Sequence, residues 1–283
     1  KEKVMSEPTI KIEPVSPIIG CEVSGVDLSK PLSAFTIEAL RDALLDHGVI
    51  FIRDQDISPA QQMTVAQAFG EPDEYPFVEG LPGYPCVTPV LKLAHETVNF
   101  GGLWHSDTTY QECPPMGTIV HARTLPSVGG DTLFASMSAA YEALSDGFKE
   151  MLSGLKAVNS AHKSRVTDTR SNRVKDAGKD TQNTIMEALH PVVRTHPETG
   201  KKALYVNGAH TTRFEGMTVQ ESEGLLGFLF RHQVREEFTC RLRWTPGSIA
   251  FWDNRCTQHF PLNDYTGHER LLHRITLKGD VPR

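Results

Sequence analysis

The pattern of apolar and polar residues predicts short strands over most of the chain. Residues 10–25 alternate between apolar and polar side chains, with Pro and Gly interrupting them, which is typical of short strands. From residue 119 onward, brief apolar runs separated by turn residues dominate. The further strands that we predict cover residues 49–54, 118–125, 131–137, 239–244, 248–253 and 270–279. SVGG at residues 127–130 predicts a hairpin-like turn, and Thr-Pro-Gly at 245–247 predicts another strand–turn–strand connection.

Helical spacing marks a smaller set of segments. Residues 36–47 carry apolar side chains at helical spacing, and Gly48 follows as a stop. Residues 58–61 (SPAQ) form a capping box with Pro at the first helical position, opening a helix that ends near Gly70. The other predicted helices cover residues 138–144, 147–155 and 218–234. Many short strands with helices at the start and in insertions favour a mainly β fold with helical decoration, a sandwich or jelly roll.

Composition narrows the possible partners. The 283 residues carry a net charge of −6 at pH 7, which disfavours nucleic acid, because phosphate neutralisation needs a basic face. No apolar run is long enough to span a membrane, and the first residues lack the apolar core of a signal peptide. The five cysteines are scattered without a C-x-x-C pair, which disfavours a disulfide framework. We therefore expect a cytoplasmic protein.

We expect a single domain over residues 1–283. Two of its segments differ in composition from the rest. Residues 1–9 read as a flexible tail. Residues 164–183 are polar and charged, with almost no large apolar side chain. Composition alone fits a solvated surface loop, but long loops in compact domains are often functional, so this segment is also a candidate lid over a site.

His105 and Asp107 could share one metal ion, because residues two apart in an extended segment face the same side. An H-x-D tripeptide is expected about once by chance in a chain with twelve histidines, so it decides nothing alone. Non-haem Fe(II) oxygenases bind iron through two histidines and one carboxylate. His259 is the strongest candidate for the third ligand, since two arginines follow it in one predicted strand. Arg270 and Arg274 lie four apart and face the same side, where a buried guanidinium needs an anion such as a dicarboxylate cosubstrate.

The chain resembles the taurine dioxygenase family of Fe(II)- and 2-oxoglutarate-dependent oxygenases. The motifs that carry the resemblance occur in the family's order over nearly the whole chain: GCEVSGVDL, FGEP, WHSDTTYQECPP, LPSVGGDTLFAS, HPVVRTHPETGKKALYVN, WDNRCTQH and HRITLKGD. The resemblance implies a double-stranded β-helix, a jelly-roll variant. It also implies an enzyme that uses Fe(II), 2-oxoglutarate and O₂ and releases succinate and CO₂.

The resemblance assigns a role to each motif residue. His105, Asp107 and His259 would hold the iron. Thr132 and Arg270 would hold the distal carboxylate of 2-oxoglutarate, and Arg274 would meet the cosubstrate or an anionic substrate. Halogenating relatives replace the carboxylate ligand with a small residue, so Asp107 favours hydroxylation.

The substrate residues depart from those of the taurine-specific enzyme. Tyr75 stands where that enzyme has a histidine, Phe100 to Gly102 stand near its asparagine, and Arg165 and His210 each stand where it has phenylalanine. A taurine clamp is thus incomplete. Tyr75, Arg165, His210 and Arg274 suit a small organic anion: a carboxylate, as in aryloxyalkanoate dioxygenases, a sulfonate or a sulfate ester.

Two other classes of function stay open at this point. One is a non-catalytic metal- or ligand-binding relative, which an intact ligand set disfavours. The other is a zinc hydrolase using the same three ligands, which leaves Arg270 unexplained. We also expect a homo-oligomer, a dimer or a tetramer.

Overall fold

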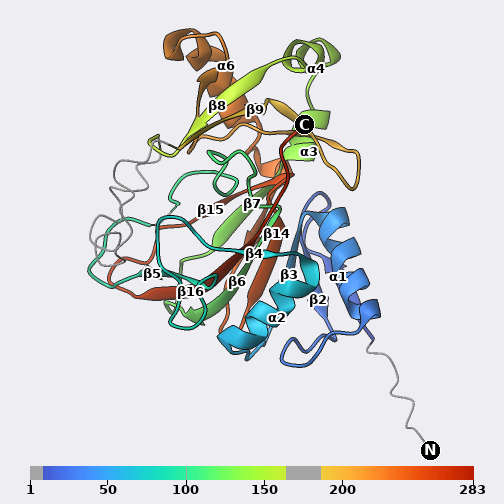
Figure 1. The fold of residues 1–283 in the computed structure, drawn as a ribbon, viewed down its shortest axis with the longest axis vertical. Coiled ribbons are helices and arrows are strands. Elements are labelled where there is room, and N and C mark those ends of the chain that lie inside the picture. Colours follow the sequence, from blue (N-terminus) through green and yellow to red (C-terminus); the bar gives the residue numbers. More distant parts are fainter. Residues whose placement is uncertain (1–8, 100, 164–185) are drawn as a thin grey trace, which may run out of the picture.

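One large β-sheet runs through the molecule (Figure 1). The computed structural model describes residues 9–99, 101–163 and 186–283. The sheet has the order β1 (Lys11–Pro14), β2 (Cys21–Ser24), β3 (Val49–Ile52), β14 (Ile249–Asp253), β6 (Gly117–Thr124), β16 (Arg270–Leu277) and β4 (Pro72–Asp73), with β5 (Thr88–Lys92) also paired to β16. Only β2 and β3 pair in parallel among these described strands. Every residue of β14 is buried, because both faces of the sheet are covered.

A second, three-stranded sheet lies against one face of the first. Its order is β13 (Thr239–Leu242), β7 (Thr132–Ser136) and β15 (Thr257–Pro261). The two sheets meet where the ring of Phe134, from β7, packs 5.6 Å from Phe51 and 5.5 Å from Trp252, measured between centroids. This two-sheet core with crossing connections is the jelly roll that the sequence predicts.

Two helices cover the other face of the large sheet, α1 (Ala34–His47) and α2 (Pro59–Phe69), seen beside β2 and β3 in Figure 1. Leu40 and Leu44 of α1 share a core cluster with residues of β3 and β16. Gly48 ends α1 with φ of 72°, a left-handed conformation that costs glycine little. The predicted capping box opens α2, where Ser58 and Gln61 exchange hydrogen bonds.

The remaining elements gather at the opposite end of the molecule from α2 (Figure 1). They are α3 (Met137–Glu142), α4 (Asp146–Leu152), β8 (Lys156–Ser160), β9 (Glu187–Pro191), β10 (Val193–Thr195), β11 (Lys202–Leu204), β12 (Thr211–Phe214), α6 (Val219–His232) and the 3-10 turn η1 (Glu236–Phe238). They enclose their own apolar cluster around Phe214 and Leu229. These elements carry the predicted helical decoration.

The structure corrects one prediction about strand pairing. The strands at 118–125 and 131–137 form no hairpin, since β6 pairs with β14 and β16 while β7 pairs with β13 and β15. The strands joined at 245–247 likewise enter different sheets. Within the described residues no helix is both long and apolar enough to cross a membrane. The predicted lid at 164–183 lies outside the described residues, as does the predicted tail apart from Thr9.

Candidate active site

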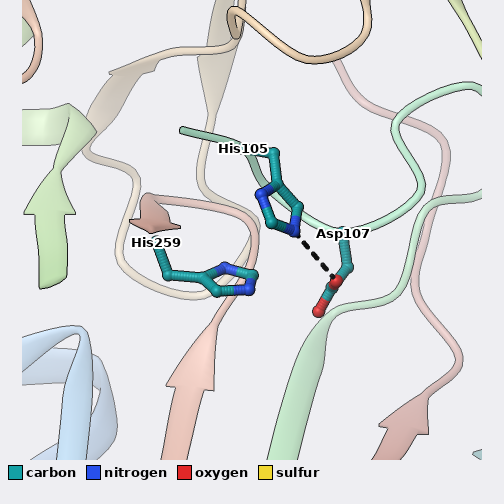
Figure 2. A group of neighbouring side chains, drawn as sticks. All are labelled: His105, Asp107 and His259. Atoms are coloured by element: carbon teal, nitrogen blue, oxygen red, sulfur yellow. Dashed lines mark ion pairs between the residues drawn. The ribbon is translucent and has the colours of Figure 1, made fainter. Parts of the chain in front are cut away.

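A backbone bridge brings His105 and His259 together. His259 lies in β15, and the short segment at His105 pairs with it in antiparallel fashion. Each residue donates its amide hydrogen to the other's carbonyl oxygen, at 3.1 and 2.8 Å. The two imidazole rings consequently lie 4.1 Å apart, and Figure 2 shows Asp107 beside them on the loop that leads on from His105. Ligand atoms of His105, Asp107 and His259 all lie within 4.8 Å of one another.

A backbone carbonyl group fixes the orientation of the His105 ring. Its Nδ1 lies 2.7 Å from the carbonyl oxygen of Leu103, which can only accept, so Nδ1 carries the hydrogen. Nε2 is then the nitrogen with a free electron pair, and it lies 3.8 Å from Asp107 Oδ1 (Figure 2). Gly101 passes directly under this ring, where an added Cβ would lie 2.7 Å from His105 Cε1.

A chain of three hydrogen bonds orients the Asp107 carboxylate. The Thr118 hydroxyl donates to Oδ2 at 2.6 Å, and the Asn254 amide donates to that hydroxyl at 2.8 Å. Asn254 is itself held by the Trp252 indole, which donates to its Oδ1 at 2.9 Å. Oδ1 of Asp107 is the oxygen that faces His105 and, at 3.6 Å, Arg274. Sequence reasoning missed Thr118 and Asn254, although Asn254 stands inside the WDNR motif.

The electrostatics of the three residues suit a divalent cation. Burial lowers the pKa of His105, and it lowers the pKa of His259 well below the ordinary value, so both rings are neutral near pH 7. Burial alone would raise the pKa of Asp107, but its neighbours outweigh burial and lower that pKa to about 2. Arg274 and the Thr118 hydroxyl are among the neighbours that lower this pKa, and the carboxylate is charged near pH 7. Two neutral imidazoles and one carboxylate are the donor set of a facial Fe(II) site.

One cavity beside this group holds Thr132 and Arg270. It is also lined by His259, Arg274 and Trp252. Thr132 Oγ1 accepts a hydrogen bond from the Trp244 indole at 3.0 Å and lies 3.5 Å from Arg270 Nη2, so both neighbours are donors. Its own hydroxyl hydrogen has no acceptor among the described residues.

Arg270 in this cavity is 4% exposed, and within the described chain it makes no ion pair. Its Nε atom is buried with no hydrogen-bond partner. The cavity therefore contains a guanidinium and a hydroxyl that could both donate to an anion.

A second cavity is lined by His105 and Asp107. Three of the residues predicted for the substrate site, Tyr75, His210 and Arg274, line this one cavity. Arg274 also lines the first cavity, and its guanidinium lies 4.3 Å above the Tyr75 ring. The predicted Arg165 lies outside the described residues.

His210 is held rigidly by a buried polar network. Its Nδ1 lies 3.0 Å from the Thr109 hydroxyl, which also accepts from Asn207. Burial lowers the pKa of His210 to about 3, so the ring is neutral near pH 7. Nε2 is the nitrogen left to face the cavity.

A second group with metal-ligand side chains has a structural explanation. His196, Asp253 and Cys256 approach one another, but His196 Nε2 lies 3.0 Å from Asp253 and its Nδ1 accepts two backbone amide hydrogens. Arg255 holds both oxygens of Asp253, at 2.9 and 2.7 Å. These contacts give His196 a structural role.

Comparison with known proteins places the chain in a family. The model of the taurine catabolism dioxygenase TauD, TfdA family matches residues 11–276. An α-ketoglutarate-dependent sulfate ester dioxygenase of Pseudomonas putida is 36% identical over 277 residues, covering 96% of this chain and 91% of the relative. An alkylsulfatase of Acinetobacter baylyi is 36% identical over 270 residues, covering 93% and 83% of the two chains.

The fold agrees with a solved structure of a taurine dioxygenase from Burkholderia xenovorans. The TM-score is 0.81 at 35% sequence identity, over 97% of this chain and 91% of the other. The predicted jelly roll and the predicted class, a dioxygenase dependent on 2-oxoglutarate (α-ketoglutarate) and non-haem iron, are thus confirmed. The chain belongs to the taurine catabolism dioxygenase TauD, TfdA family.

Proposed function

We propose that this dioxygenase oxidises a small sulfate ester that carries an apolar chain. The observation that carries the proposal is the second cavity, which joins the His105–Asp107–His259 group to a cationic inner end and an apolar mouth. Arg274 lies at the inner end. Val98 and Leu103 line the mouth and are 57% and 49% exposed.

His105, Asp107 and His259 would hold Fe(II). Their fit rests on the donor set described above, with Asp107 Oδ1 and His105 Nε2 turned toward the shared space. When bound, the iron with 2-oxoglutarate and O₂ supplies the oxidant that hydroxylates an unactivated C–H bond. The protein's own part is to hold the ligands in one orientation through Leu103, Thr118 and Asn254.

Thr132 and Arg270 would hold the distal carboxylate of 2-oxoglutarate. The fit rests on the Thr132 hydroxyl hydrogen and the Arg270 Nε hydrogen, which have no acceptor among the described residues. A carboxylate in this cavity would accept both and neutralise a buried charge.

Arg274 and His210 would hold the substrate's anionic group. Arg274 supplies charge, and in the tautomer whose Nδ1 accepts from the Thr109 hydroxyl, neutral His210 supplies one hydrogen through Nε2. Tyr75 packs against the Arg274 guanidinium and positions it. A tetrahedral sulfate offers oxygens to both residues, with its carbon chain directed toward Val98 and Leu103.

The names of the two 36% identical relatives, a sulfate ester dioxygenase and an alkylsulfatase, support the same choice of substrate class. Hydroxylation of the carbon that carries the ester oxygen gives a hemiacetal-like ester. Its collapse breaks the carbon–oxygen bond to sulfate, leaving an aldehyde, sulfate and a proton. In the same reaction 2-oxoglutarate is converted to succinate and CO₂.

A substrate panel tests the proposal. Purified enzyme with Fe(II), 2-oxoglutarate and O₂ is given hexyl sulfate, hexanesulfonate, hexanoate or phenoxyacetate, and succinate, aldehyde and sulfate are measured. We expect kcat/KM for hexyl sulfate to exceed the others by about 10-fold or more, with one aldehyde per succinate. Preference for a carboxylate or sulfonate would reject the sulfate ester assignment.

The same panel separates the remaining alternatives. A zinc hydrolase would release sulfate and an alcohol without 2-oxoglutarate or O₂, and a non-catalytic relative would release nothing. We also propose that the chain forms a single domain, that it is cytoplasmic, and that it assembles as a dimer or a tetramer. Sedimentation analysis of the purified chain tests the oligomer.

A further inference from the structure

Lys92 lies directly opposite Arg270 in the sheet. Lys92 ends β5, Arg270 begins β16, and the two are Cα partners in the antiparallel register. Partners in such a pair project to the same face, with Cβ atoms about 5 Å apart. Both side chains are buried, at 5% and 4% exposure, and both line the cavity that contains Thr132. Two cations are thus built into one wall of the proposed cosubstrate site.

This arrangement is unfavourable for an empty cavity. Like charges directly opposite in a sheet repel each other, and burial strengthens the repulsion. Across the described residues no carboxylate comes within ion-pair distance of Lys92, and its Nζ makes no hydrogen bond. The contact that it makes is with the Tyr265 ring, whose centroid is 4.3 Å from Nζ and 5.9 Å from the Arg270 guanidinium carbon. An anion between the two cations would remove the repulsion.

Tyr265 fixes where that anion would lie. Its hydroxyl donates to Asn99 Oδ1 at 2.7 Å, and Asn99 donates to the carbonyl oxygens of Pro261 and Leu262. The ring is therefore held in place, with both cations within 6 Å of its centroid. Lys92, Arg270 and Thr132 all line this cavity.

We propose that Lys92 is a third binding residue for the distal carboxylate of 2-oxoglutarate, beside Arg270 and Thr132. This inference rests on the proposed cosubstrate site and extends it. Arg270 is suited to a planar, two-point contact with a carboxylate, whereas the Lys92 ammonium adds a point charge with three donors. Together they make the site selective for a 2-oxo acid with a second, distal carboxylate.

The test measures ligand binding without any primary substrate. Calorimetry follows 2-oxoglutarate, or 2-oxopentanoate with a methyl group in place of the distal carboxylate, binding to Mn(II)-loaded protein. In Lys92→Met we expect 2-oxoglutarate to bind about 10- to 100-fold more weakly, the usual worth of a charged hydrogen bond. Binding of 2-oxopentanoate should change less than about twofold.

Two control variants locate the cause of any failure. Lys149→Met removes a lysine that also lies over a tyrosine ring but contacts no residue of the cavity. This variant should leave both affinities unchanged. Arg270→Met should lose 2-oxoglutarate binding. If Arg270→Met loses it and Lys92→Met does not, the Lys92 inference is overturned while the cosubstrate site stands. If neither loses it, the site itself is wrongly assigned.

A melting curve excludes a merely structural role. Ligand-free Lys92→Met should melt no lower than the native chain, because one of two opposed buried charges is gone. A lower melting temperature, with both 2-oxo acids weakened alike, would make Lys92 a packing residue and overturn the proposal.

Discussion

At the scale of single residues, the site depends on groups that hold the ligands as much as on the ligands themselves. Gly101 has φ of 70° and runs beneath the His105 ring. Any side chain there meets both a strained backbone and the imidazole, so the position is restricted to glycine.

Gly101→Ala should therefore disturb the metal site more than the fold. Its Cβ would lie 2.7 Å from His105 Cε1, so the ring must move away from Asp107 and His259. We expect Mn(II) or Fe(II) affinity to fall by about 10-fold or more, as for other changes around metal ligands. Gly102→Ala is the matched control, because its Cβ would have no neighbour nearer than 3.7 Å. Equal affinity in the two variants would contradict this role.

Thr118→Val should weaken metal binding while keeping the side chain's volume. The valine cannot donate to Asp107 Oδ2, so the carboxylate loses the contact that fixes its rotation. We expect a loss of about 10- to 100-fold in Mn(II) affinity by calorimetry. Thr118→Ser retains the hydroxyl and should restore the affinity, and its failure to do so would point to packing instead.

The resemblance predicts the metal ligands from sequence, but it does not predict these supporting contacts. His105, Asp107 and His259 stand in motifs whose letters imply their chemistry. Thr118 and Asn254 act only because the fold places the Thr118 hydroxyl against the Asp107 carboxylate and the Asn254 amide against that hydroxyl. The role that we propose for Lys92 likewise depends on its register with Arg270 in the sheet.

At the scale of elements, local signals predict helices better than they predict strand partners. The Ser58 capping box and the Gly48 helix end are predicted correctly, because each signal depends on residues close by in sequence. SVGG is a fair turn signal, yet the partners of β6 are β14 and β16, which lie more than a hundred residues away in sequence. A hairpin at this place is wrong because each of the two strands completes a different sheet.

Buried charges tie the end of β14 to the helix α1. Arg255 is 5% exposed and binds both Asp253 and Glu198, and Glu198 also binds Arg41 of α1. Burial raises the pKa of Asp253, but hydrogen bonds from Arg255 and His196 outweigh it and lower that pKa to about 2. The carboxylate therefore stays charged and needs its partner.

Arg255→Met should destabilise the protein by about 3–5 kcal/mol, because it leaves the Asp253 carboxylate buried without its guanidinium. Arg41→Met removes a far more exposed cation from the same Glu198 and should cost less than about 1 kcal/mol. Urea unfolding at pH 7 gives both values. Similar losses in the two variants would contradict the importance of burial.

At the scale of the whole molecule, the jelly roll brings the loop at His105 next to strands near the C-terminal end of the chain. The loop at His105 and strand β15 lie more than a hundred residues apart in sequence, and together they supply the metal-ligand group His105, Asp107 and His259. Two cavities adjoin this group. Arg274 lines both cavities, so cosubstrate and substrate would meet beside the same three ligands. The fold class and this convergence are predictable from the ordered motifs, whereas the shape of the substrate cavity is not.

On the proposed function, His105, Asp107 and His259 would hold Fe(II) with 2-oxoglutarate beside it. The most direct measurement is an anaerobic titration of the protein with Fe(II) and 2-oxoglutarate, following the weak visible charge-transfer band of the chelate. We expect the native chain to develop the band, His259→Ala to lose it, and Arg270→Met to require at least about 10-fold more 2-oxoglutarate. A band of native intensity and affinity in His259→Ala, or no band in the native chain while zinc binds tightly, would contradict the account.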